Sequence, residues 1–278
     1  MLWRCLLGGV RHDHPDLVAS LRAAQDSFQL AAWNGIYYHQ IKAVEEDIPW
    51  IEALLEKSGP NPQDIREALS WRRRRARLLY TLADLFPSLI DLLPDVAVKS
   101  TIRETENYFS NHDGIGGQVR ELLKAPLRRM FADGDRVMVI GHSMGSIIAY
   151  DALWELWHVE QNPGRIDLFL SLGSPLGMRF VQERLLGFRD AAGRRFPGNI
   201  RHWKNAAARG DLAALDPVVR NDFVPMVEQG LTQSIEDMHE DLYTYFRNQD
   251  GLNVHRSYGY LVHPHVGRVI ADWWRAGD

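Results

Sequence analysis

The stretch VMVIGHSMGSIIAY, residues 137–150, contains a strand pattern, a tight turn and a helix pattern in one short segment. Apolar, partly β-branched residues come first, as in a strand buried on both faces of a parallel sheet. Gly141 and Gly145 then flank Ser143. A turn this sharp needs residues without bulk around it, and it pushes the serine toward a sparsely populated backbone conformation. We therefore predict a strand, a turn that presents Ser143, and a helix.

Other short apolar runs predict further strands of the same sheet. The predicted strands lie at residues 2–7, 28–33, 136–140, 166–172 and 200–206. Helical patterns lie between them, at residues 16–25 and 118–131, and after Ser143, where one apolar stripe comprises Ile148, Ala152, Leu156 and Val159. A last helix is expected to start at Pro264. Strands that alternate with helices predict a single α/β domain over residues 1–278, with a mostly parallel sheet covered by helices on both faces.

Residues 41–111 interrupt this alternation. They show helical periodicity without a convincing strand and are too long for a loop in a compact domain. We interpret them as a helical insertion, a cap, with a kink at Pro87. The basic run at residues 71–77 is the kind of segment that contacts anionic lipid. Because aspartates follow it on the polar face of the next helix, we expect a solvated surface instead.

Composition narrows the class of protein. The formal net charge is −4, so no overall basic field favours nucleic acid or an anionic membrane as a partner. Cys5 is the only cysteine, which excludes an internal disulfide and fits a reducing compartment. No apolar run approaches the ~20 residues of a spanning helix, and no signal peptide is apparent. We expect a soluble, cytoplasmic protein.

The turn at Ser143 points to nucleophilic catalysis. A serine hydroxyl is a poor nucleophile unless a base takes its proton and a carboxylate orients the base. The N-terminus of the following helix favours an oxyanion, and the N–H of Met144 is the expected first donor. The strand, the G-x-S-x-G sequence and the helix together resemble the nucleophile elbow of the α/β-hydrolase family. We expect His142, inside the elbow, to be a packing residue.

The resemblance implies a triad in the chain order serine, acid, histidine, with the last two after late strands. Residues 203–211 resemble the strand-plus-acid segment of bacterial lipase-like hydrolases, which favours Asp211 as the acid. Asp216, followed by Pro-Val-Val, is the alternative. The alternative to a catalytic role is, for either aspartate, a helix N-cap or a turn residue.

Four histidines near the C-terminus are candidates for the base. The segment NVHRSYGYLVHP, residues 253–264, resembles the one that precedes the last helix in the same lipase-like group, which places the role on His255. His263 and His265 flank Pro264 and are alternatives that can instead cap or pack against the helix. His239 lies in a stretch that we interpret as an amphipathic helix.

The family's second oxyanion donor comes from the loop after an early strand. The corresponding loop here is Gly8-Gly9-Val10, after the predicted strand at residues 2–7, and we name the N–H of Val10. Many family members carry His-Gly at this point. The chain begins at this strand, so we expect either a family sheet that is trimmed at its N-terminal side or a true start that lies upstream.

These features predict a serine hydrolase that cleaves a carboxylic ester, small or lipid-like, without a metal or an organic cofactor. Two alternatives remain: a hydrolase-fold protein that binds without turnover, and an acyltransferase or thioesterase that uses the same triad. The sequence RHDHPD, residues 11–16, resembles part of a zinc-hydrolase motif but lacks its last ligand. The glycine-rich residues 112–118 lack the lysine and the preceding strand of a phosphate-binding loop.

Overall fold

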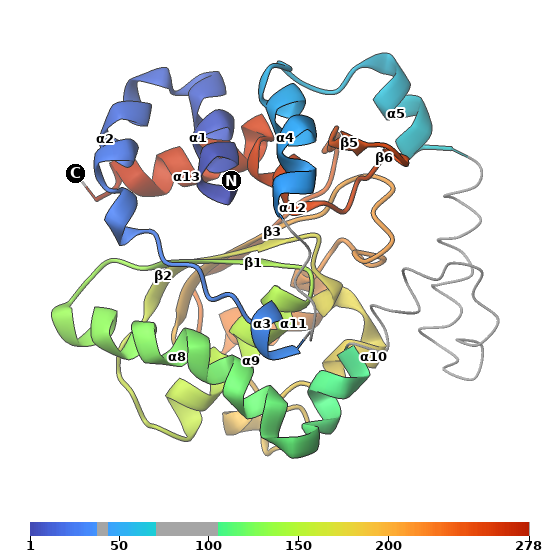
Figure 1. The fold of residues 1–278 in the computed structure, drawn as a ribbon. Coiled ribbons are helices and arrows are strands. Elements are labelled where there is room, and N and C mark those ends of the chain that lie inside the picture. The colour runs from blue at the N-terminus through green and yellow to red at the C-terminus, as the bar shows by residue number, and fades with distance from the viewer. Residues whose placement is uncertain (38–43, 71–104, 278) are drawn as a thin grey trace.

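A parallel sheet lies between two layers of helices in the computed structural model, which describes residues 1–37, 44–70 and 105–277 (Figure 1). The strands are β1 (Met138–His142), β2 (Ile166–Leu172), β3 (Ile200–Ala206) and β4 (Ser234–Met238). They pair in chain order, and all three pairings are parallel. The α/β class and the parallel sheet agree with the sequence prediction. In the described part of the chain, no helix is long and apolar enough to cross a membrane.

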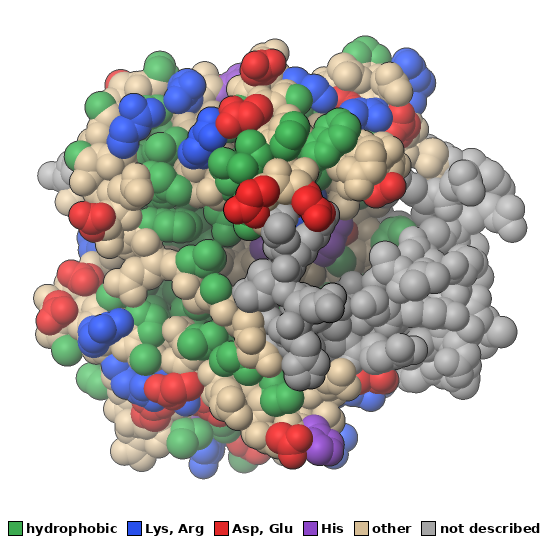
Figure 2. All heavy atoms as spheres, in the orientation of Figure 1, with side chains coloured by type: hydrophobic (Ala, Val, Ile, Leu, Met, Phe, Trp, Pro, Cys, Tyr) green, Lys and Arg blue, Asp and Glu red, His purple; other side chains and the backbone are tan. Residues whose placement is uncertain are grey.

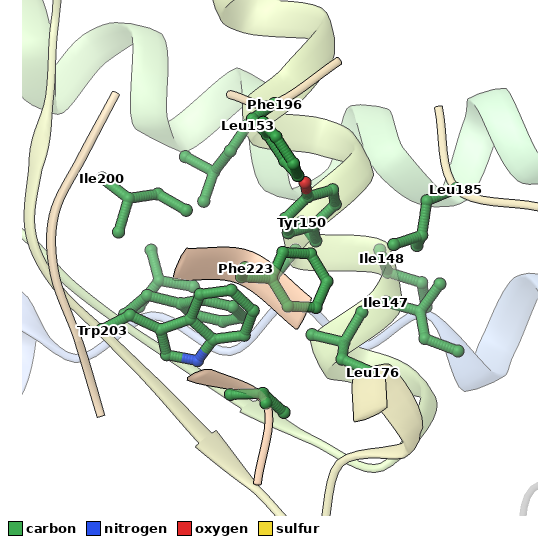
Figure 3. Close-up of a cluster of buried hydrophobic side chains, with 14 of the residues drawn as sticks. Ile147, Ile148, Tyr150, Leu153, Leu176, Leu185, Phe196, Ile200, Trp203 and Phe223 are labelled. Atoms are coloured by element: carbon green, nitrogen blue, oxygen red, sulfur yellow. The ribbon is translucent and has the colours of Figure 1, made fainter. Parts of the chain in front are cut away.

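One face of the sheet packs against α8 (Ile115–Asp133), α9 (Met144–His158) and α11 (Arg220–Glu228). Aromatic rings fill the space between these helices and the strands, as Figure 3 shows for Trp203, Tyr150 and Phe223. Helix α9 is buried on most of its surface and not along one stripe alone. Of the four stripe residues predicted for it, only Val159, at the end of the helix, is exposed.

The other face is covered by helices from both ends of the chain. They are α1 (Leu2–Asp13), α4 (Ile48–Leu55), α12 (Ser257–Leu261) and α13 (Pro264–Arg275). The two faces alternate along each strand, so Phe169 of β2 joins the first layer while Leu168 and Leu170 join the second. Helices thus cover both faces of the sheet.

The strand predicted at residues 2–7 is wrong, because this segment is the first half of α1. Its buried side chains, which include Cys5, Leu6 and Val10, recur at helical spacing and pack on the sheet. A β-carbon on Gly9 would lie 2.3 Å from the carbonyl oxygen of Leu261, and one on Gly267 of α13 would lie 2.1 Å from that of Gly9. The glycines that suggested a turn therefore allow close contact between helices.

Other predicted elements fit less uniformly. The strands at 166–172 and 200–206 are β2 and β3, and the strand at 136–140 is β1, displaced by two residues. Residues 28–33 form no strand, and the helix predicted around His239 is wrong because β4 occupies its first part. The charged Glu236 and Asp237 of this edge strand hid its pattern.

The remaining elements with complete bounds are short. They are η1 (Pro15–Leu17), α2 (Val18–Ala23), η2 (Gln25–Ser27), α3 (Asn34–Tyr37), η3 (Val44–Asp47), α5 (Pro62–Ala68), η5 (His112–Gly114), η6 (Pro175–Gly177), α10 (Arg179–Gln182), η7 (Ala192–Arg194), β5 (Arg247–Asn248) and β6 (Gly251–Leu252). Residues 105–110, at the end of the predicted insertion, are also helical. The described parts of the predicted insertion, residues 44–70 and 105–111, contain helices and no strand. The basic run at 71–77 and Pro87 lie outside the described residues.

Candidate active site

Ser143 occupies a strained turn between β1 and α9. Its backbone dihedrals are φ 53° and ψ −128°, a conformation that residues other than glycine rarely adopt. A β-carbon on Gly141 would approach the Cα of Ser146 to 2.7 Å, so the turn closes only with glycine there. One on Gly145 would meet nothing nearer than Trp33 Nε1, at 3.9 Å. Of the two glycines that flank the serine, Gly141 is the one that the turn requires.

Three polar side chains from distant parts of the chain meet at this turn. His255 Nε2 lies 2.9 Å from Ser143 Oγ, and His255 Nδ1 lies 3.0 Å from Asp211 Oδ2. Ser143 follows β1, Asp211 follows β3, and His255 precedes α12. The sheet brings them together because the carboxyl ends of parallel strands share one edge. We call these residues the triad.

Asp211 is held by three donors although it is only 1% exposed. Tyr260 Oη donates to Oδ2 at 2.6 Å, in addition to His255, and the backbone N–H of Ala213 donates to Oδ1 at 2.9 Å. Burial raises the pKa of this carboxyl, but the nearby His255 and these hydrogen bonds outweigh burial and lower the pKa below its ordinary value. Asp211 is therefore a carboxylate at neutral pH.

The imidazole of His255 responds in the opposite sense. Burial lowers its pKa, but the charge of Asp211 and the hydrogen bond to it dominate, so the pKa of His255 is raised above the ordinary histidine value. With Nδ1–H donated to Asp211, the unprotonated Nε2 faces the hydroxyl of Ser143. In this state His255 is able to accept the serine proton.

Tyr260 is a site residue that the sequence did not reveal as one. Its hydroxyl accepts a hydrogen bond from the Ala208 N–H at 2.9 Å while it donates to Asp211. Burial and the charge of Asp211 raise the pKa of Tyr260 well above its ordinary value, so the hydroxyl keeps its proton. The signal was present in the segment SYGYL beside His255, but nothing local indicates which tyrosine reaches the acid.

The other candidates for base and acid lie apart from the triad contacts. His263 Nδ1 accepts a hydrogen bond from the His265 N–H and caps α13, and burial lowers the pKa of His263 to about 3. Asp216 is exposed and its Oδ1 accepts a hydrogen bond from Val218 N–H, as a turn residue does. His239 follows β4. The structure brings Asp211 and His255, and not these residues, to Ser143.

The two predicted oxyanion donors fare differently. Helix α9 begins at Met144, so its N–H is among those that a helix leaves without an intrahelical acceptor. Val10 is fully buried in the second half of α1, where a helix uses its own N–H groups. The prediction that Val10 lies in a loop and donates from it is therefore wrong. Its cause is the helix that replaces the expected strand.

An ion pair joins the histidine segment, residues 253–264, to the start of α4. Arg256, next to His255, contacts the buried carboxylate of Asp47, the last residue of η3. The guanidinium also lies 5.3 Å from the ring centre of Tyr258.

The site is open to solvent on one side. In Figure 2, histidine atoms are visible in a recess near the middle of the face that the figure shows, below acidic side chains. The His255 side chain is 33% exposed, so the imidazole is not sealed from solvent in the described structure.

The zinc-like sequence at residues 11–16 does not assemble a site. His12 Nδ1 contacts Asp13, and Asp16 pairs with Arg275. Among the described residues, no group of three or more histidine, cysteine or acidic side chains is arranged to hold a metal ion.

Comparisons with known proteins give no match for this chain. No protein-family model, no curated protein and no solved structure matches it.

Proposed function

We propose that this protein is a serine hydrolase of the α/β-hydrolase fold that cleaves carboxylic esters. The observation that carries the proposal is the unbroken chain of contacts from Ser143 Oγ to His255 Nε2 and from His255 Nδ1 to Asp211. The positive φ of Ser143 between a strand and a helix adds to it. Serine, acid and histidine also follow one another in the chain order of that family.

In the proposed reaction, Ser143 Oγ attacks the ester carbonyl while His255 Nε2 takes the hydroxyl proton. Asp211 holds the imidazole in the correct tautomer and stabilises the imidazolium. The N–H of Met144 donates to the oxyanion of the tetrahedral intermediate. His255 then protonates the leaving alcohol, and in the second half-reaction it activates a water that releases the acid. Every proton in this cycle moves between substrate, Ser143, His255 and water.

Turnover of p-nitrophenyl esters of graded acyl length tests the proposal. We expect the intact protein to release p-nitrophenol with an initial burst, because acylation and deacylation are separate steps. Ser143→Ala should abolish the burst. Ser110→Ala, which removes an exposed serine hydroxyl bonded to the Asn107 carbonyl, should retain it. No turnover of any ester, or equal turnover by Ser143→Ala, would reject the proposal.

The fate of the acyl group separates hydrolysis from transfer. The same triad makes an acyl-enzyme in either case, so we propose water as the acceptor and test it by product analysis. The free acid should be the product even when an alcohol or a thiol is supplied. An ester or thioester as the main product would identify a transferase with the same nucleophile.

A further inference from the structure

His142 lies between the nucleophile and the base without belonging to the triad. It is the last residue of β1, directly before Ser143, and its side chain lies against the histidine segment. Its Nε2 is 2.6 Å from the backbone carbonyl oxygen of His255. The two imidazole rings lie with centres 4.7 Å apart and planes inclined by 36°. His142 thus contacts His255 at its backbone and at its ring.

The hydrogen bond fixes the tautomer of His142. A carbonyl oxygen can only accept, so Nε2 must carry the proton and donate it. Burial, together with the nearby His255, lowers the pKa of His142 to about 3, so this ring is neutral wherever His255 titrates. A neutral ring at this distance does not oppose the positive charge that forms on His255 during proton transfer.

We propose that His142 is a positioning residue that holds the His255 imidazole in line with Ser143 and Asp211; this rests on the proposed function. The Nε2–H of His142 fixes the His255 backbone, and with it the point from which the catalytic imidazole extends, while the His142 ring lies beside that imidazole. Asp211 and Ser143 fix Nδ1 and Nε2 of the same imidazole. Residue 142 at the end of β1 therefore links the strand that carries the nucleophile to the segment that carries the base.

Two substitutions separate the donor from the ring. His142→Gln keeps an N–H donor that can reach the carbonyl, and His142→Phe keeps a ring without a donor. His158→Phe is the matched control, because His158 Nε2 contacts the Phe196 carbonyl at 2.8 Å and its ring lies 5.2 Å from that of Trp154, away from the triad. The control reports what the loss of such a hydrogen bond does to folding alone.

The pH dependence of phosphonylation by a fluorophosphonate and the titration of His255 by NMR are the two readouts. In His142→Phe we expect phosphonylation to slow by ~10–100-fold, as for a misplaced catalytic group. The pKa of His255 should also fall toward its ordinary value, because the imidazole spends less time against Asp211. His142→Gln and His158→Phe should keep the pKa of the intact protein. An unchanged pKa in His142→Phe, or an equal fall in His142→Gln, overturns the inference.

The two readouts also separate this inference from the proposed function. If the intact protein resists the fluorophosphonate, the proposed function fails. The NMR titration of His255 still decides whether His142 positions it. If the intact protein reacts and the His142→Phe variant keeps both its rate and its His255 titration, the proposed function stands and the role of His142 is rejected.

Discussion

Asp211 and Asp151 are both 1% exposed, yet their surroundings move their pKa values in opposite directions. Asp151, on α9, accepts hydrogen bonds from Tyr108 Oη and from the Leu186 N–H, each at 2.9 Å. These bonds do not offset burial, which raises the pKa of Asp151 to about 7. Asp211 has comparable donors and, in addition, an imidazole in direct contact.

The cation whose charge acts on Asp151 is shared with other groups. Arg120 donates to Tyr108 Oη at 3.2 Å and pairs with Glu155 at 2.9 Å. Its charge lowers the pKa of Asp151, but burial outweighs this effect. In this comparison the pKa of a buried carboxyl stays raised when hydrogen bonds and a more distant cation oppose burial, and it is lowered when a basic partner is in direct contact. This contrast fits Asp211 as the carboxylate of the proposed triad and Asp151 as a structural acid.

The largest expected effect is the loss of reactivity in Asp211→Asn. The asparagine amide would donate a hydrogen bond to Nδ1 of His255, so the imidazole proton would move to Nε2. A protonated Nε2 cannot accept the proton of Ser143. We expect the rate of fluorophosphonate labelling to fall on the order of 10³–10⁴-fold. Asp216→Asn, at the alternative acid, should label at close to the rate of the intact protein. The reverse ranking of the two variants would assign the acid to Asp216.

Asp151→Asn should instead change how stability depends on pH. Asp151 ionises in the unfolded chain near pH 3.8 but in the folded protein only near pH 7, so the folded state binds more protons in between. Stability therefore falls as pH rises through this window. Asparagine does not titrate, so the loss between pH 5 and pH 8 should shrink by on the order of 2–3 kcal/mol. Denaturant unfolding at both pH values measures it, and labelling of Ser143 should change little.

The same pH-dependent loss in Asp151→Asn and in the intact protein would show that Asp151 is ionised in both states. The contrast with Asp211 would then disappear. A large fall in the labelling of Asp151→Asn would instead show that Asp151 affects the reactivity of the triad.

Tyr260→Phe is the mildest test of what keeps Asp211 ionised. Removal of the hydroxyl takes one donor from Oδ2 and leaves the Ala208 N–H without its acceptor. The carboxylate then interacts more strongly with His255, so the pKa of His255 should rise further. As pH is lowered, reactivity should therefore be lost at a higher pH than in the intact protein. We expect labelling at pH 7 to fall about tenfold, which is less than the ~10²–10⁴-fold that a general acid or base itself contributes.

Tyr245→Phe is the control for Tyr260→Phe. Tyr245 is a buried tyrosine of the same layer, and its hydroxyl reaches the Val262 carbonyl at 3.5 Å. If both variants shift the pH profile equally, the effect of Tyr260 is not on Asp211.

Three of the four strands β1–β4 were predicted from the sequence, whereas helix α1 was not. Runs such as residues 166–172 are apolar and bounded by polar or glycine residues, which is typical of buried parallel strands. The apolar run at residues 2–7 looks the same over so few residues, and only its packing against α13 selects a helix. Strand β4 was missed because charged residues interrupt its pattern at the edge of the sheet.

The site divides in the same way. Ser143 could be predicted because the turn requires a local sequence. Asp211 and His255 could be predicted because their segments resemble those of lipase-like hydrolases. The contacts of Tyr260 with Asp211 and of His142 with the His255 carbonyl join residues far apart in the chain. No local pattern specifies such contacts. The Val10 prediction failed because it depended on a strand that the chain does not form.

Mapping a fluorophosphonate adduct by mass spectrometry tests the central claim most directly. We expect a single adduct on Ser143, its absence in Ser143→Ala, and markedly slower formation in His255→Ala. Formation should speed up as pH rises through a pKa above the ordinary histidine value near 6.5. No adduct on the folded, intact protein, or an adduct that forms equally fast on Ser143 when His255 is replaced, would contradict an activated serine.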